Sequence, residues 1–224
     1  MTTFKRARSE EQREIRRQAI LDTTAAMLDQ MAVNEVSLNE LSRRVGLAKS
    51  NVLRYFESRE AILLELLDQA WKQWIGRLSE RLAADVDPQG TPRRRGDQLA
   101  AALTRSLAPE RVFCDLLSAQ AGVLEHNVSV EAVTRYKRAS LDNFTAMTEL
   151  VRRHLPELGD QAFMACGAAI VLIGALWVQT CPSDSMLAAY EADPSLAALR
   201  LDFATALEEV LATQITGALA RTAS

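Results

Sequence analysis

Helical spacing of apolar residues is the feature of this sequence that most narrows its fold. Glycine and proline number only nine and six in 224 residues, and they fall between stretches in which apolar side chains recur every three or four positions. Alternating β-branched runs, which would indicate strands, are nearly absent. The sequence therefore predicts an all-α protein. We expect helices at about 10–31, 38–45, 49–56, 58–84, 97–107, 110–125, 129–155, 160–180, 184–191 and 195–221.

Composition and charge are those of an ordinary globular protein, with 48% apolar and 25% charged residues. The net charge is −3, yet residues 1–60 carry eleven Lys and Arg against nine Asp and Glu, which is +2. This asymmetry weakly indicates that the first part of the chain meets a polyanion. The basic start of the chain is followed by no apolar stretch, so it is not a secretory signal and we expect a cytoplasmic protein.

Cysteine usage argues against a disulfide framework or a metal site. Cys114, Cys166 and Cys181 are widely spaced, form no C-x-x-C pair, and have only His126 and His154 as imidazole partners. We expect reduced thiols, no metal and no cofactor. Cys114 and His126 could be imagined as a nucleophile and its base, but no known local signature or phosphate loop accompanies them, which argues against an enzyme.

One segment could be mistaken for a membrane span, because residues 162–178 include no charged or strongly polar side chain. Seventeen residues lie at the lower limit for crossing about 30 Å of hydrocarbon, and no basic cluster flanks them. A helix that is apolar all round also suits the centre of a helical protein or an oligomer interface. We therefore favour a buried helix and expect no membrane association.

The most specific local pattern begins at Ser37. Ser37 and Glu40 have the S-x-x-E spacing of a capping box, and apolar residues follow at helical spacing up to Gly46. Gly46 is suited to a helix end that needs a positive φ. A second short segment starts at Lys49, and Ser58 can cap the next long helix. Two short helices joined by a tight glycine-containing turn match a helix-turn-helix unit.

At these residues the sequence resembles the DNA-binding segment of the TetR (tetracycline repressor) family. The matching positions are Gly46, Lys49, the Tyr55-Phe56 pair and the run 58–62, and the resemblance covers roughly residues 12–64. Two positions depart from the family pattern. Ala48 stands where a capping serine is usual, and Leu53 stands where the family usually has a tyrosine that contacts the DNA backbone.

The resemblance implies an amino-terminal three-helix helix-turn-helix DNA-binding domain over residues 1–64. A recognition helix needs polar groups on one face to read base edges and apolar groups such as Val52, Leu53 and Phe56 on the other. The residues expected to face the major groove, where each contacts a base or a phosphate, are Lys49, Ser50, Asn51 and Arg54, and those expected to hold phosphates are Ser37, Arg44, Tyr55 and Arg59. A flexible basic arm holding Lys5, Arg6 and Arg8 could add contacts to DNA.

For residues 65–224 the family implies a helical domain that binds an effector and dimerises. We expect a homodimeric repressor that a small, largely apolar effector releases from its operator. For each effector residue taken singly, a place in the plain core is the favoured alternative. The effector residues expected are Trp71, Trp74, Phe113, Cys114, Leu117, Gln120, His126, Tyr136, Asn143, Phe144 and Met147.

The dimer surface is expected on the last two long helices. Its candidates are Phe163, Gly167, Ile170, Gly174 and Trp177, with Leu201, Ala204, Leu207, Leu211 and Ile215 on the final helix. The alternative is that these faces pack within one subunit. A helical scaffold in which the resemblance is incidental is the rival to a DNA-binding regulator.

Overall fold

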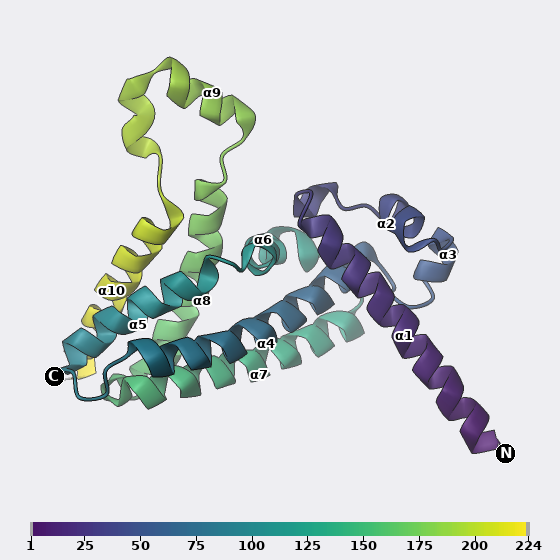
Figure 1. Ribbon diagram of the computed structural model, residues 1–224, viewed down its shortest axis with the longest axis horizontal. Coiled ribbons are helices and arrows are strands. Elements are labelled where there is room, and N and C mark those ends of the chain that lie inside the picture. The colour runs from purple at the N-terminus through teal and green to yellow at the C-terminus, as the bar shows by residue number, and fades with distance from the viewer. Residues whose placement is uncertain (1, 223–224) are drawn as a thin grey trace. The chain divides into compact units, whose positions relative to one another are not determined.

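The computed structural model describes residues 2–222 and, for residues 2–9, the backbone alone (Figure 1). Every regular element in this part of the chain is helical, which confirms the all-α prediction. The elements are α1 (Thr2–Leu28), η1 (Val33–Glu35), α2 (Leu38–Val45), α3 (Lys49–Val52), α4 (Arg59–Asp85), α5 (Pro92–Leu107), α6 (Arg111–Ala119), the π-helix η2 (Gln120–Leu124), α7 (Val130–His154), η3 (Pro156–Leu158), α8 (Gln161–Thr180), α9 (Asp184–Ala192), η4 (Pro194–Leu199) and α10 (Phe203–Thr222).

The chain forms two compact units. Residues 1–67 and 119–136 make up the first, called the head unit below, and residues 68–118 and 137–224 make up the second, the body unit. The head unit therefore holds the expected domain 1–64 together with a second stretch of chain. Helices α4 and α7 each run from one unit into the other.

The head unit is organised around a small apolar core. Ile20 and Leu21 of α1, Leu41 of α2 and Val52 of α3 are fully buried, and Phe56 is 4% exposed. Burying a side chain of this kind stabilises a fold by about 1.5–3 kcal/mol. This core fixes the short helices α2 and α3, which are too short to persist alone in water.

In the body unit, α10 packs along α5 and α8. Gly96 of α5 allows the close approach, since a Cβ atom there would lie 2.9 Å from Cγ2 of Ile215. Leu207, Leu211 and Ile215 of α10 are 0–4% exposed. Three of the five residues expected to form the stripe on the last helix thus fill the interior of the subunit, whereas Ala204 is exposed and Leu201, also exposed, precedes α10.

Helix α8 carries apolar residues on all sides. By length and composition it could cross a membrane, and only 33% of its most apolar window is buried inside the structure. Ala162, Cys166, Ala169 and Ile173 face the interior of the body unit. The rest of the helix therefore presents an apolar surface that its own subunit leaves uncovered.

Three helices begin several residues away from their predicted starts. Helix α5 begins at Pro92, inside the expected loop, because Thr91 caps it by accepting from the N–H of Arg94 at 3.3 Å. Proline at the first helical position needs no donor, so it starts this helix where the sequence suggested a break. Helix α10 begins at Phe203 and not near residue 195. Helix α1 begins at Thr2, so the expected flexible arm has a helical backbone, and the side chains of Lys5, Arg6 and Arg8 lie outside the described residues.

Candidate nucleic-acid interface

Of the two hydrogen bonds of the capping box predicted for helix α2, only the one to Ser37 is present. Oγ of Ser37 accepts a hydrogen bond from the N–H of Glu40 at 3.2 Å. The Glu40 carboxylate does not complete a capping box but accepts from Arg43 and Arg44, the latter at 2.8 Å. These arginine hydrogen bonds lower the pKa of Glu40 to about 2. The carboxylate therefore stays ionised and links the first and last turns of α2.

Gly46 makes the turn between α2 and α3. It has φ 72° and ψ 27°, the left-handed region that residues with a Cβ rarely adopt. The N–H of Leu47 then donates to the carbonyl of Ser42 at 3.0 Å. This closes the end of α2 and sets the direction in which α3 leaves.

Helix α3 is a single turn that continues as hydrogen-bonded turns to Phe56, whose N–H donates to the carbonyl of Val52 at 3.1 Å. Ala48 provides no side-chain cap. Val52 and Phe56 point into the core as predicted, but Leu53 is 40% exposed, so the expectation that it anchors the helix is wrong. The four side chains expected to face the major groove, Lys49, Ser50, Asn51 and Arg54, are all exposed.

Three of the four residues expected to hold phosphates already make interactions within the head unit. Arg44 donates to Glu40 and to the Gln30 side chain, both at 2.8 Å. Arg59 donates to the carbonyl of Val36 at 3.0 Å and is largely covered. Ser37 is occupied as a cap. These three side chains stabilise the head unit, and a phosphate would be bound by the donors that these interactions leave unused, such as the O–H of Ser37.

A basic groove that the sequence did not reveal lies between α1 and the end of residues 49–56, called the α3 segment below. It has a volume of about 410 Å³ and is lined by Gln12, Arg13, Arg16, Arg54 and Tyr55. Within the described part of the chain, neither Arg13 nor Arg16 has an acidic partner. The spacing of residues 13 and 16 on an exposed helix face could have identified them, but the tertiary contact with α3 could not be read from sequence.

Arg17 joins three elements of the head unit. Its guanidinium makes two hydrogen bonds to the carboxylate of Glu65 on α4. It also lies over the ring of Phe56, 4.6 Å from the centroid, in a cation-π contact. The end of the α3 segment is therefore held between α1 and α4.

Glu57 joins the α3 segment to the start of α7. Its carboxylate accepts from the backbone N–H of Ser129 at 2.6 Å and from Oγ of Ser129 at 2.7 Å. Ser129 in turn caps α7 by accepting from the N–H of Ala132 at 3.1 Å. The two bonds from Ser129 hold the pKa of Glu57 below its ordinary value of 4.5. These hydrogen bonds connect residues 119–136 to the end of the α3 segment.

Several of the expected effector residues form one aromatic cluster in the body unit. The rings of Trp74 and Phe113 stack with centroids 5.1 Å apart, and Trp71 lies 6.1 Å from Phe113. The indole N–H of Trp74 donates to Oγ of Ser106 at 2.8 Å. The indole nitrogen of Trp71, also buried, has no hydrogen-bond partner among the described residues.

The other expected effector residues do not gather at one place. Asn143 donates to Asp68 at 2.8 Å, and Met147 lines a cavity of about 10 Å³ between α5, α7, α8 and α10. Such a cavity holds no more than about one water molecule. In the body unit Leu117 is also buried and Phe144 half-buried, whereas Gln120, His126 and Tyr136 belong to the head unit.

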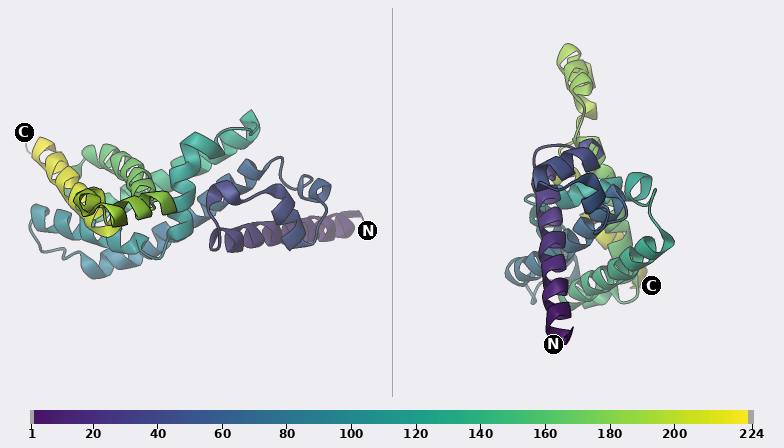
Figure 2. Two further views of the ribbon diagram at one scale, coloured as in Figure 1. Left: turned by 90° about the horizontal axis from the view of Figure 1, so that it is seen from above. Right: turned by 90° about the vertical axis from the view of Figure 1, so that its right-hand side faces the viewer.

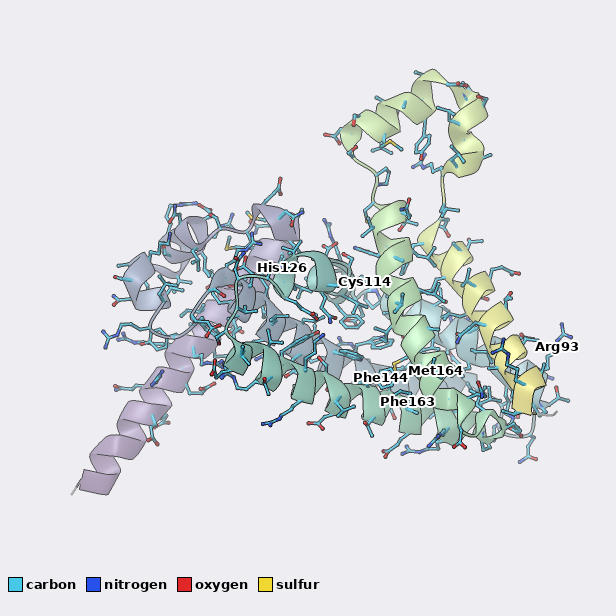
Figure 3. All side chains as sticks on the ribbon, turned by 180° about the vertical axis from the view of Figure 1, so that it is seen from behind. Arg93, Cys114, His126, Phe144, Phe163 and Met164 are labelled. Atoms are coloured by element: carbon cyan, nitrogen blue, oxygen red, sulfur yellow. The ribbon has the colours of Figure 1, made fainter. Side chains whose placement is uncertain are left out.

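Cys114 is buried in α6 (Figure 3). Burial raises the pKa of its thiol to about 12, so the sulfur is protonated at neutral pH. A thiol in this state is a poor nucleophile.

The expected dimer residues are divided between the interior and the surface of the body unit. Gly174, Leu207 and Leu211 are interior, as the alternative from the sequence allowed. Gly167 and Ile170 are half-buried. Trp177 donates to Asp115 at 2.6 Å. Phe163 is 50% exposed beside Phe144, with ring centroids 4.7 Å apart (Figure 3).

Two family models match this chain. The model of bacterial regulatory proteins of the tetR family matches residues 20–66, and that of the tetracyclin repressor-like C-terminal domain matches residues 68–222. The chain belongs to the TetR family. It is therefore a transcription regulator and not an enzyme.

Individual relatives agree with this assignment. The HTH-type transcriptional regulator BetI of Cronobacter sakazakii is 22% identical over 166 residues, 74% of this chain and 79% of that protein. A tetR-family transcriptional regulator from Streptomyces coelicolor has a TM-score of 0.55 at 16% identity, covering 94% of this chain and 82% of that one. FadR from Bacillus subtilis, solved with stearoyl-CoA, has a TM-score of 0.54 at 13% identity, covering 89% and 98%. At these identities the solved structures support the TetR fold alone.

Proposed function

We propose that this TetR-family chain is a homodimeric, cytoplasmic repressor that binds an inverted-repeat operator and is released by a small, largely apolar effector. The observation that carries the DNA-binding part is the groove of Arg13, Arg16, Arg54 and Tyr55 beside the exposed side chains of α3. Guanidinium groups bind phosphate in a bidentate manner, and polar side chains on a short helix read base edges.

The homodimer is supported by the uncovered face of α8. Met164, Val171 and Val178 are 68%, 69% and 54% exposed and recur every seven residues, so they lie along one side of the helix. An exposed apolar stripe of this length is typical of a protein interface. Together with Phe163, it replaces the interior positions Gly174, Leu207 and Leu211 as the proposed dimer surface. Two recognition helices related by a two-fold axis would meet two half-sites of DNA.

The effector is supported by polar atoms buried without partners in the body unit. Within the described residues, the indole nitrogen of Trp71 and Oγ1 of Thr104 have no hydrogen-bond partner. Unpaired buried groups of this kind are unfavourable unless a ligand or water satisfies them. Because the aromatic cluster is closely packed, a ligand would have to move side chains to enter, and this would shift the population of conformations. Similar folds bind ligands, as in FadR with stearoyl-CoA and the multidrug binding protein EbrR with imidazole.

The experiment uses the protein and a duplex from its own upstream region that holds an inverted repeat. Charge reversal at Lys49 and Arg54 should abolish salt-sensitive binding in a gel shift, because both side chains are exposed and positively charged. A thermal-shift screen then identifies ligands, and each hit is added to the protein–DNA complex. No binding by the unmutated protein would favour a helical scaffold, and a ligand that leaves DNA affinity unchanged would refute release by effector.

A further inference from the structure

Residues 183–200, called the arm below, lie between α8 and α10 and contain α9 and η4. Both helices have regular caps: the N–H of Met186 donates to Oγ of Ser183 at 3.4 Å, and the N–H of Ser195 donates to Asp193 at 2.9 Å. Figure 1 and Figure 2 show the arm projecting from the ends of α8 and α10. No residue of either helix is buried.

A helix of nine residues is marginal in water unless it packs on another surface. Within the body unit, the arm's two helices pack mainly on each other. The arm therefore needs a surface that one subunit does not offer.

The side chains at and next to the arm are suited to a protein surface. Met186, Leu199 and Leu201 are 47%, 67% and 45% exposed. The concave side, between the arm and the ends of α8 and α10, is an open groove of about 570 Å³ whose lining includes Trp177, Tyr190 and Phe203. Aromatic side chains of this kind are enriched at the centres of protein interfaces.

The charge of the arm narrows the classes of partner that can pack on it. The arm contains Asp184, Glu191 and Asp193, with Arg200 as its single basic residue. An acidic surface disfavours DNA and anionic lipid headgroups. The apolar stripe of Met164, Val171 and Val178 ends where the arm begins, so the uncovered surface of α8 continues into the arm.

We propose that the arm of one copy packs on a second copy of this chain, beyond the α8 stripes that meet at the two-fold axis. In an isologous dimer each surface occurs twice, so both arms contact the partner. This inference rests on the proposed homodimer. It adds a second contact region, contributed by residues 183–201, to the α8 interface.

The first test measures the dimer dissociation constant by sedimentation of a dilution series. The variant Met186→Ser/Leu199→Ser/Leu201→Ser changes only side chains that are already exposed in the subunit, so folding should not change. We expect the constant to rise at least about tenfold, since three apolar contacts are lost. The matched control Val130→Ser/Leu141→Ser alters side chains that are 78% and 58% exposed elsewhere, and should leave the constant unchanged.

The second test identifies the surface that the arm touches. A photoreactive benzoylphenylalanine replaces Met186 in ¹⁵N-labelled chains, which are mixed with unlabelled wild-type chains before irradiation and mass spectrometry. Cross-links between labelled and unlabelled peptides are expected. Cross-links confined to one chain, or a triple variant that dimerises like its control, would overturn the arm proposal while the homodimer stands. A wild-type chain that stays monomeric at all concentrations would overturn both.

Discussion

The contact between Glu57 and Ser129 gives the sharpest prediction about the head unit. Two donors of Ser129 reach one carboxylate at 2.6 and 2.7 Å. Hydrogen bonds to an ionised group contribute about 1.5–3 kcal/mol when buried, but Glu57 is exposed. Solvent screening reduces the contribution, so we expect Glu57→Ala to lower the free energy of unfolding by about 1 kcal/mol.

Acid should remove this contribution. The pKa of Glu57 is lower in the folded protein than its ordinary value of 4.5, so the unfolded chain takes up the proton first. The stabilisation is therefore complete above pH 4.5 and is lost as the pH falls through the lowered pKa. The difference between wild type and Glu57→Ala should be constant from pH 7 down to about pH 5 and shrink below that.

The assay is urea unfolding followed by far-ultraviolet circular dichroism at one fixed protein concentration, since dimerisation couples to stability. Glu131→Ala is the matched control because Glu131 is an exposed carboxylate in the first turn of α7, the helix that Ser129 caps. It should change stability by no more than about 0.5 kcal/mol through the helix dipole. Equal losses for Glu57→Ala and Glu131→Ala would refute the reasoning, as would a Glu57→Ala effect that does not decrease between pH 5 and pH 3.

Three further predictions test the turn, the helix packing and the groove. Gly46→Ala should cost about 1–2 kcal/mol of stability from the left-handed φ alone, measured by urea unfolding, and an unchanged midpoint would contradict this. Gly96→Ala should destabilise by about 1 kcal/mol through its contact with Ile215, whereas Gly217→Ala, which meets nothing within 4 Å, should stabilise; the same sign for both in thermal unfolding would rule out the packing argument. Arg13→Ala/Arg16→Ala should reduce the slope of log affinity against log salt by about 4 in operator titrations, because the proposed dimer loses two arginines in each subunit, and an unaltered slope would exclude phosphate contacts.

Local signals predicted the part of the fold that depends on local chemistry. The end of α2 at Gly46 and its N-cap at Ser37 could be predicted because each requires a particular residue type at one position. The same reasoning failed at Pro92, where proline opens a helix, and at Glu40, whose carboxylate has two arginines within reach. Whether a proline starts or ends a helix, and which partner a carboxylate meets, depends on three-dimensional geometry. The spacing of apolar residues along the sequence does not specify that geometry.

The site was predictable to the extent that it is local. The exposed polar side chains of α3 follow from helical spacing, but the placement of Arg13 and Arg16 beside Arg54 depends on how α1 packs. On α10, the stripe of Leu207 and Leu211 was readable as apolar, yet sequence could not decide whether it faces another helix of the same subunit or of a partner. Burial inside one subunit and burial at a dimer interface produce the same apolar spacing in a single sequence.

The distribution of tryptophan has a practical consequence for spectroscopy. All three indoles, Trp71, Trp74 and Trp177, belong to the body unit, and two of them hydrogen-bond to Ser106 and Asp115. Tryptophan fluorescence therefore reports on the body unit, while the head unit has no indole emission of its own. A ligand that repacks the aromatic cluster should shift the emission spectrum without any label, and operator DNA will do so only to the extent that its binding is transmitted to the body unit.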